Sequence, residues 1–113
     1  MRRKRQLTAS QCNKRDRLLA EFLQHHKGRA NVVGRTEIAE FLTANGYEQK
    51  ATTTNMLVRT VMYDRRLPIC EINGRGYYWA ESKSDFEDTI NDLEKRIASM
   101  REHIEFLKSF MYE

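Results

Sequence analysis

The sequence predicts a mainly α-helical fold with one small β-hairpin, in the order three helices, hairpin and long final helix. Apolar residues recur at spacings of three and four through most of the chain, which is typical of helices that bury one face. The stretch "PICEINGRGYYWAE" at residues 68–81 breaks this period, because two short apolar runs flank a turn-forming "NGRG". A chain of 113 residues suffices for one such domain with an appended element.

We expect the first helix to begin at Thr8 or Ser10, both good N-cap residues, and to end near His26. Its apolar stripe consists of Leu18, Leu19, Phe22 and Leu23. A brief β-like connection, "NVVG", leads to a short second helix in "RTEIAEFLTANGY", where the "NG" pair is a strong stop signal.

The third helix is expected over residues 52–66, with one of its three leading threonines as the N-cap. Steps of three and four residues divide this helix into two faces. The inward face consists of Thr54, Val58, Val61, Met62 and Arg65. The outward face, which we call the outward ridge, consists of Thr52, Asn55, Arg59 and Tyr63.

The hairpin follows Pro68, which has no N–H and forbids continuation of the helix. Side chains alternate across a strand, so Tyr77 and Trp79 share one face of the return strand and Tyr78 lies on the other. We expect Tyr77 and Trp79 to cover the core. The turn places Arg75 at the tip of the hairpin.

This order of elements is that of a winged helix-turn-helix domain, here residues 8–81. The segments "RTEIAEFL", the threonine-rich start of the third helix, "LPI" and "GYYWAES" resemble the N-terminal domains of biotin-ligase-type repressors and phage-encoded winged-helix regulators. The resemblance covers residues 14–82 and implies a recognition helix followed by a wing. Arg65-Arg66 stand where that family usually has a glycine. The architecture is also similar to that of bacterial replication terminator proteins.

Positive charge is concentrated in the first third of the chain. Residues 1–35 carry ten Lys and Arg against two acids, residues 36–80 carry five of each, and residues 81–113 carry five bases against nine acids. A clustered basic region is the electrostatic signature of a protein that binds a polyanion. Residues 1–7 are expected to form a flexible basic arm that tracks a DNA backbone or minor groove.

The outward ridge carries residue types that read DNA. Arg59 can bond guanine and Asn55 adenine in bidentate fashion, while threonine hydroxyls suit phosphates and Arg75 suits a minor groove or a phosphate. The alternative is a solvated helix face and a solubilising charge on the loop. The expected DNA-binding residues are Arg2, Arg3, Lys4, Arg5, Thr52, Thr53, Asn55, Arg59, Tyr63 and Arg75.

Residues 82–113 predict a long helix capped by Ser82 or Ser84, with the apolar period of 3.5 that marks a left-handed coiled coil. We expect it to form a homodimer, and the alternative is packing against the first helix of the same chain. The residues of this seam are Phe86, Ile90, Leu93, Ile97, Met100, Ile104, Leu107 and Met111.

Charges flanking the seam favour an antiparallel dimer. With Ile97 opposite the partner's Met100, Glu87 lies near Lys108 and Glu94 near Arg101 across the interface, and symmetry doubles both pairs. A parallel dimer would instead bring like charges together. Isoleucine at a positions with leucine at d positions is the opposing signal, because that combination suits parallel dimers.

No signature of an enzyme, cofactor or metal site is found in the sequence. There is no glycine-rich phosphate loop and no paired nucleophile and base, and His25, His26 and His103 lack ligand spacing. No apolar run is long enough to span a membrane, and no secretory signal is evident. Cys12 and Cys70 are expected to be reduced, as in a cytoplasmic protein.

The expected function is therefore binding of double-stranded DNA as a homodimer. Such a protein would regulate transcription or act in phage or replication control. The alternative is a winged-helix adaptor or inhibitor, encoded by a phage, that binds a host protein.

Overall fold

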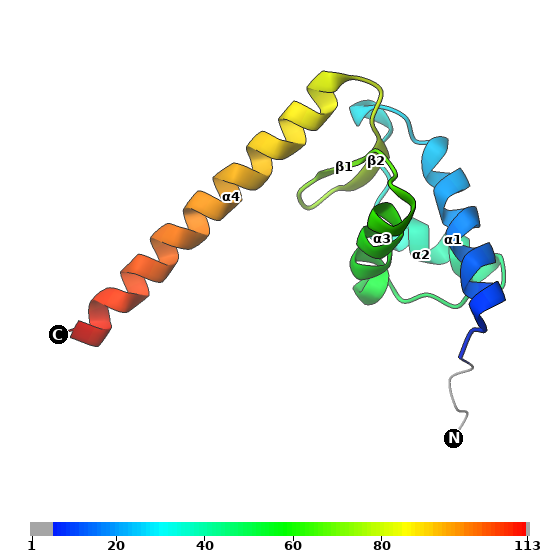
Figure 1. Cartoon of the computed structure of the whole chain (residues 1–113), viewed down its shortest axis with the longest axis horizontal. Helices are drawn as coiled ribbons and strands as arrows, with labels where there is room; N and C mark the ends of the chain where they lie inside the picture. The colour runs from blue at the N-terminus through cyan, green and yellow to red at the C-terminus, as the bar shows by residue number, and fades with distance from the viewer. Residues whose placement is uncertain (1–5, 113) are drawn as a thin grey trace.

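The computed structural model describes residues 6–112, which form four α-helices and a two-stranded antiparallel hairpin in the expected order (Figure 1). The basic residues Arg2, Arg3, Lys4 and Arg5 lie outside the described range. The elements are α1 (Ala9–Gln24), the 3₁₀ turn η1 (Arg29–Asn31), α2 (Arg35–Ala44), α3 (Ala51–Arg65), β1 (Ile69–Ile72), β2 (Gly76–Trp79), α4 (Lys83–Ser109) and the 3₁₀ turn η2 (Phe110–Tyr112).

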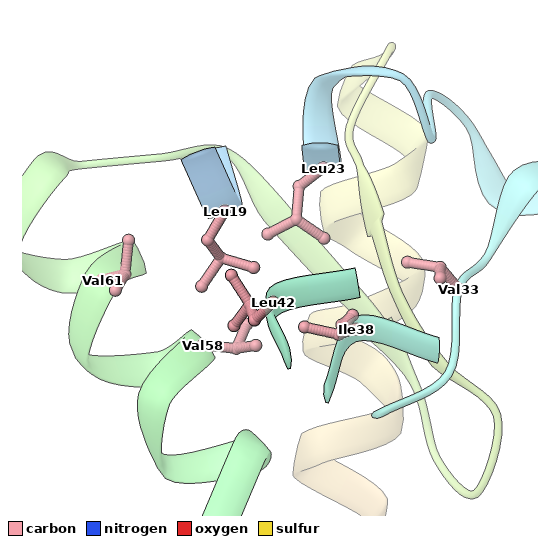
Figure 2. Close-up of a cluster of buried hydrophobic side chains, with 7 residues drawn as sticks. All are labelled: Leu19, Leu23, Val33, Ile38, Leu42, Val58 and Val61. Atoms are coloured by element: carbon pink, nitrogen blue, oxygen red, sulfur yellow. The ribbon is translucent and has the colours of Figure 1, made fainter. Parts of the chain in front are cut away.

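One apolar core joins α1, α2 and α3, as Figure 2 shows. Its fully buried members are Leu19, Leu23, Val33, Ile38, Leu42, Val58 and Val61. At the edge of this core, the rings of Phe22 and Phe41 stack with centroids 4.1 Å apart. Burying each large aliphatic side chain contributes about 1.5–3 kcal/mol, so this cluster is what holds α3 against the first two helices.

The helix starts show where local sequence rules succeed and where one fails. Thr8 caps α1 as expected, because its hydroxyl accepts from the Gln11 N–H at 3.1 Å while Gln11 accepts from the Thr8 N–H at 2.8 Å. The expectation of a threonine cap on α3 is wrong: Lys50 is the N-cap and its side chain makes no capping bond. The Thr54 hydroxyl instead donates to the Lys50 carbonyl at 2.7 Å, inside the first turn.

The hairpin is fastened to the segment between α1 and α2 by backbone hydrogen bonds. Val33 and Tyr77 exchange two of them, at 2.8 and 2.9 Å, and Trp79 donates to the His26 carbonyl at 2.7 Å. Tyr77 and Trp79 pack against the core from this side and stay half-buried. Tyr78, on the opposite face, is the fully buried aromatic residue of the strand. The hairpin is therefore covered on both faces.

The α4 helix begins at a Ser82 capping box, as expected, and packs its first half against β1. The Thr89 hydroxyl donates to the Glu71 carbonyl at 3.4 Å, and Arg96 lies 3.6 Å from the Glu71 carboxylate. The second half of α4 projects away from residues 8–81, which we call the head (Figure 1). Among residues 6–112, no helix is long and apolar enough to cross a bilayer.

Burial at the hairpin predicts a loss of stability at alkaline pH. Burial raises the pKa of Cys70 above its ordinary value of 9.0 and raises the pKa of both Tyr77 and Tyr78 above 10.0. The native state therefore holds these protons more tightly than the unfolded chain does. Stability is retained below these ordinary values and falls as pH rises through the native pKa values.

Urea unfolding at pH 8 to 11 measures this effect. We expect the wild-type free energy of unfolding to fall across that range, and we expect Tyr78→Phe to reduce the fall. The matched control is Tyr63→Phe. Because Tyr63 is exposed, this substitution should leave the pH dependence of the free energy of unfolding unchanged. Equal slopes for all three proteins would show that ionisation of Tyr78 is not linked to folding.

Candidate nucleic-acid interface

The outward ridge of α3 is solvent-exposed over its whole length. Thr52, Asn55, Arg59 and Tyr63 are all exposed, while Thr54, Val58 and Val61 are buried on the other side of the helix. Met62 is half-buried, which leaves Arg65 as the one predicted inward residue that is exposed. Its guanidinium instead bonds Asn13 on α1, at 2.6 Å. The division of α3 into two faces is otherwise as the spacing predicts.

The ridge is tied to the hairpin by one hydrogen bond. The Tyr77 hydroxyl donates to the Asn55 Oδ1 at 2.7 Å. This bond occupies the Asn55 Oδ1 and leaves the NH₂ group of the same amide available as a donor. The sequence assigned Tyr77 to the core on strand alternation alone, because the position of its hydroxyl depends on how the hairpin packs on α3.

A groove of about 520 Å³ runs between the hairpin tip, the start of α2, α3 and α4. It is lined by Arg35, Asn55, Arg75 and Arg96, together with the carboxylates of Glu37 and Glu71. A Cβ atom on Gly34 would lie 3.4 Å from the Arg75 carbonyl oxygen, so the start of α2 and the hairpin tip are in contact. Sequence reasoning missed Arg35, because only this tertiary contact brings it to the groove.

Two arginines that line the groove, Arg35 and Arg75, form no salt bridge within residues 6–112, and neither does Arg59 on the outward ridge. Arg96, by contrast, is held by Glu71 at 3.6 Å and by Asp92 at 3.3 Å. Burial and the charge of Glu71 raise the pKa of Tyr77, while the positive charges of Arg59 and Arg35 oppose that rise. Positive charge from Arg35, Arg59 and Arg75 therefore stands beside the carboxylates of Glu37 and Glu71.

The two threonines expected at phosphates differ in the state of their hydroxyls. The Thr53 hydroxyl donates to the Lys50 carbonyl at 3.2 Å and accepts from Gln49 at 2.9 Å. Thr52 is the ridge member and is exposed. Thr52 is accordingly the better phosphate donor of the two.

The seam of α4 is a second exposed surface. Its eight residues are between 38% and 75% exposed, so the chain's own helices do not cover them. Packing of this seam against α1, the alternative left open by the sequence, is not what the structure shows. Within residues 6–112, no three His, Cys, Asp or Glu side chains are grouped as metal ligands would be.

Comparisons of this chain with protein-family models, with curated proteins and with solved structures found no match.

Proposed function

We propose that this chain binds double-stranded DNA as a winged helix-turn-helix protein, with α3 in the major groove and the hairpin as the wing. The observation that carries the proposal is the placement of three unpaired arginines around an exposed polar ridge. Arg59 lies on that ridge, Arg75 lies at the hairpin tip, and Arg35 lies at the start of α2.

Each part of this surface suits a different feature of DNA. Arg59 presents a planar fork that matches guanine O6 and N7, and Asn55 presents its NH₂ group to a base edge. Arg35 and Arg75 flank the ridge and suit the phosphates on either side of the groove. Because a duplex exposes one charge about every 1.7 Å of its axis, two flanking cations add affinity whatever the sequence.

The proposed protein acts as a homodimer through the seam of α4. A stripe of eight exposed apolar residues from Phe86 to Met111 is more than a single helix leaves in water without a partner. A two-fold dimer carries two ridges and two wings and so fits an inverted-repeat site. Control of transcription or of replication is the role that such a dimer would serve.

Fluorescence anisotropy on a random-sequence duplex, repeated over a range of salt concentrations, tests the proposal. We expect wild-type affinity to fall linearly on a log–log plot, and Arg75→Ala to lower that slope by about 0.9. Lys83→Ala is the matched control, because it removes a charge whose side chain is 91% exposed at the start of α4. This control should leave the slope unchanged.

Absence of binding at low salt would overturn the proposal. An unchanged slope for Arg75→Ala would remove the hairpin from the interface. Absence of binding would favour the alternative, in which the chain is an adaptor or inhibitor that binds a host protein.

A further inference from the structure

Besides the seam, α4 carries a second periodic face. Its only partly buried positions are Asp85, Thr89, Asp92 and Arg96, at spacings of four, three and four. Thr89 and Arg96 contact Glu71 of β1, so this face is the one that packs on the head. Continued at the same spacing along the helix, this second face consists of Ser99, His103, Phe106 and Phe110.

The distal part of this second face is aromatic and has no cover. Phe106 is 61% exposed and Phe110 is 57% exposed, and their rings meet edge to face with centroids 5.2 Å apart. Arg96 is the last α4 residue joined to the head by a hydrogen bond or an ion pair within residues 6–112. Phe110 lies 14 positions beyond Arg96, about 21 Å along the helix. The chain's own head therefore does not reach the pair.

An antiparallel seam brings a second head to this pair. With Ile97 opposite the partner's Met100, Phe86 faces the partner's Met111, so the distal end of one α4 lies beside the proximal end of the other. In an antiparallel coiled coil, the residues that flank the seam on one side occupy equivalent heptad positions in the two helices. The face of one α4 that packs on its own head and the aromatic pair of the partner therefore lie on the same side of the dimer.

We propose that Phe106 and Phe110 of each chain pack against the head of a second copy of this chain. In a parallel dimer the same two rings would lie at the far end from both heads, exposed to water. The contact would lock each head to the coiled coil and so set the distance between the two proposed DNA-binding ridges. This inference rests on the homodimer of the proposed function and is independent of DNA binding.

Disulfide crosslinking tests the orientation. Phe86→Cys and Met111→Cys are made separately in a Cys12→Ser background, where the remaining Cys70 is only 2% exposed. We expect no covalent dimer from either variant alone and efficient crosslinking when the two are co-expressed. Efficient crosslinking of Phe86→Cys to itself would overturn the inference.

Photocrosslinking tests the contact itself. A benzophenone attached to Phe110→Cys, in dimers whose second chain is isotopically heavy and lacks the probe, should label heavy peptides from the head. The control position is Tyr112→Cys, because Tyr112 is 83% exposed and lies outside both faces. Labelling confined to α4 peptides would overturn the proposed contact.

Sedimentation equilibrium gives the third measurement. We expect Phe106→Ala/Phe110→Ala to weaken the dimer about tenfold or more, and Tyr112→Ala to leave it unchanged. Because both rings are exposed in the single chain, alanine should not unfold the head. A monomeric wild type would overturn the dimer and this inference, but not DNA binding by the head. A dimer insensitive to the double variant would overturn this inference alone.

Discussion

Replacing Gly76 with alanine is expected to destabilise the head by about 3 kcal/mol or more, the largest loss from any single glycine of the chain. Gly76 opens β2 with a φ of 135°, a conformation that side-chain-bearing residues rarely adopt. A Cβ there would overlap the Val33 carbonyl and lie 2.8 Å from the Gly34 Cα. The clash involves backbone atoms, which no rotamer change relieves.

Chemical denaturation of Gly76→Ala and Gly74→Ala measures the difference. Gly74 also has a positive φ, of 79°, but a Cβ there meets nothing within 4 Å. Its substitution should cost only the left-handed backbone strain, about 1–2 kcal/mol. Equal losses for the two variants would show that the close approach of β2 to the Val33 segment does not constrain the fold.

The same contact shows which parts of this fold could be predicted from sequence. The "NGRG" turn was predictable, because residues that tolerate positive φ mark a turn locally. The approach of Gly76 to Val33 was not, because it depends on the pairing of β2 with a segment more than 40 positions earlier. For the same reason the sequence placed Tyr77 and Trp79 over the core but gave no sign that Tyr78 is buried on the other face.

The ends of the helices likewise include some that could be predicted from sequence and one that could not. The caps at Thr8 and Ser82 were predictable, because a capping box is formed by residues three apart. At α3 three adjacent threonines suggested an N-cap without a capping-box partner, and Lys50 is the cap of a helix that begins at Ala51. Arg66 adopts a φ of 53° at the end of α3. This left-handed conformation at a helix end is one that glycine usually supplies.

The candidate site follows the same division. The outward ridge was predictable, because it depends on the helical period alone, and the exposure of its four residues confirms it. Arg35 and the bond from Tyr77 to Asn55 were not, because α2, α3 and the hairpin must pack before those groups meet. The seam of α4 was found by its period, whereas the second face became visible only from the partial burial of Asp85, Thr89, Asp92 and Arg96.

Replacing Arg59 with alanine is expected to have the largest effect on DNA binding. Arg59 is exposed in the middle of the outward ridge, is free of salt bridges within residues 6–112, and lies one helical turn from Asn55. A bidentate arginine–guanine contact is worth about 1–3 kcal/mol of discrimination, so the preferred site should bind about 10- to 100-fold more weakly. Affinity for random DNA should fall much less, because the other cations remain.

Selection of bound sequences from a random pool, followed by anisotropy on the selected site, measures this effect. Arg59→Lys is the matched control, because lysine keeps the charge but not the planar two-donor fork. We expect Arg59→Lys to retain the wild-type salt dependence of affinity but to lose the preference at one base pair. We expect Arg59→Ala to lose that preference and also to show a weaker salt dependence. If Arg59→Ala selects the same sequences with the same affinity, α3 does not read the major groove through its outward ridge. The exposed arginine would then be a solvated surface charge, and the wing or another face of the head would have to account for any binding.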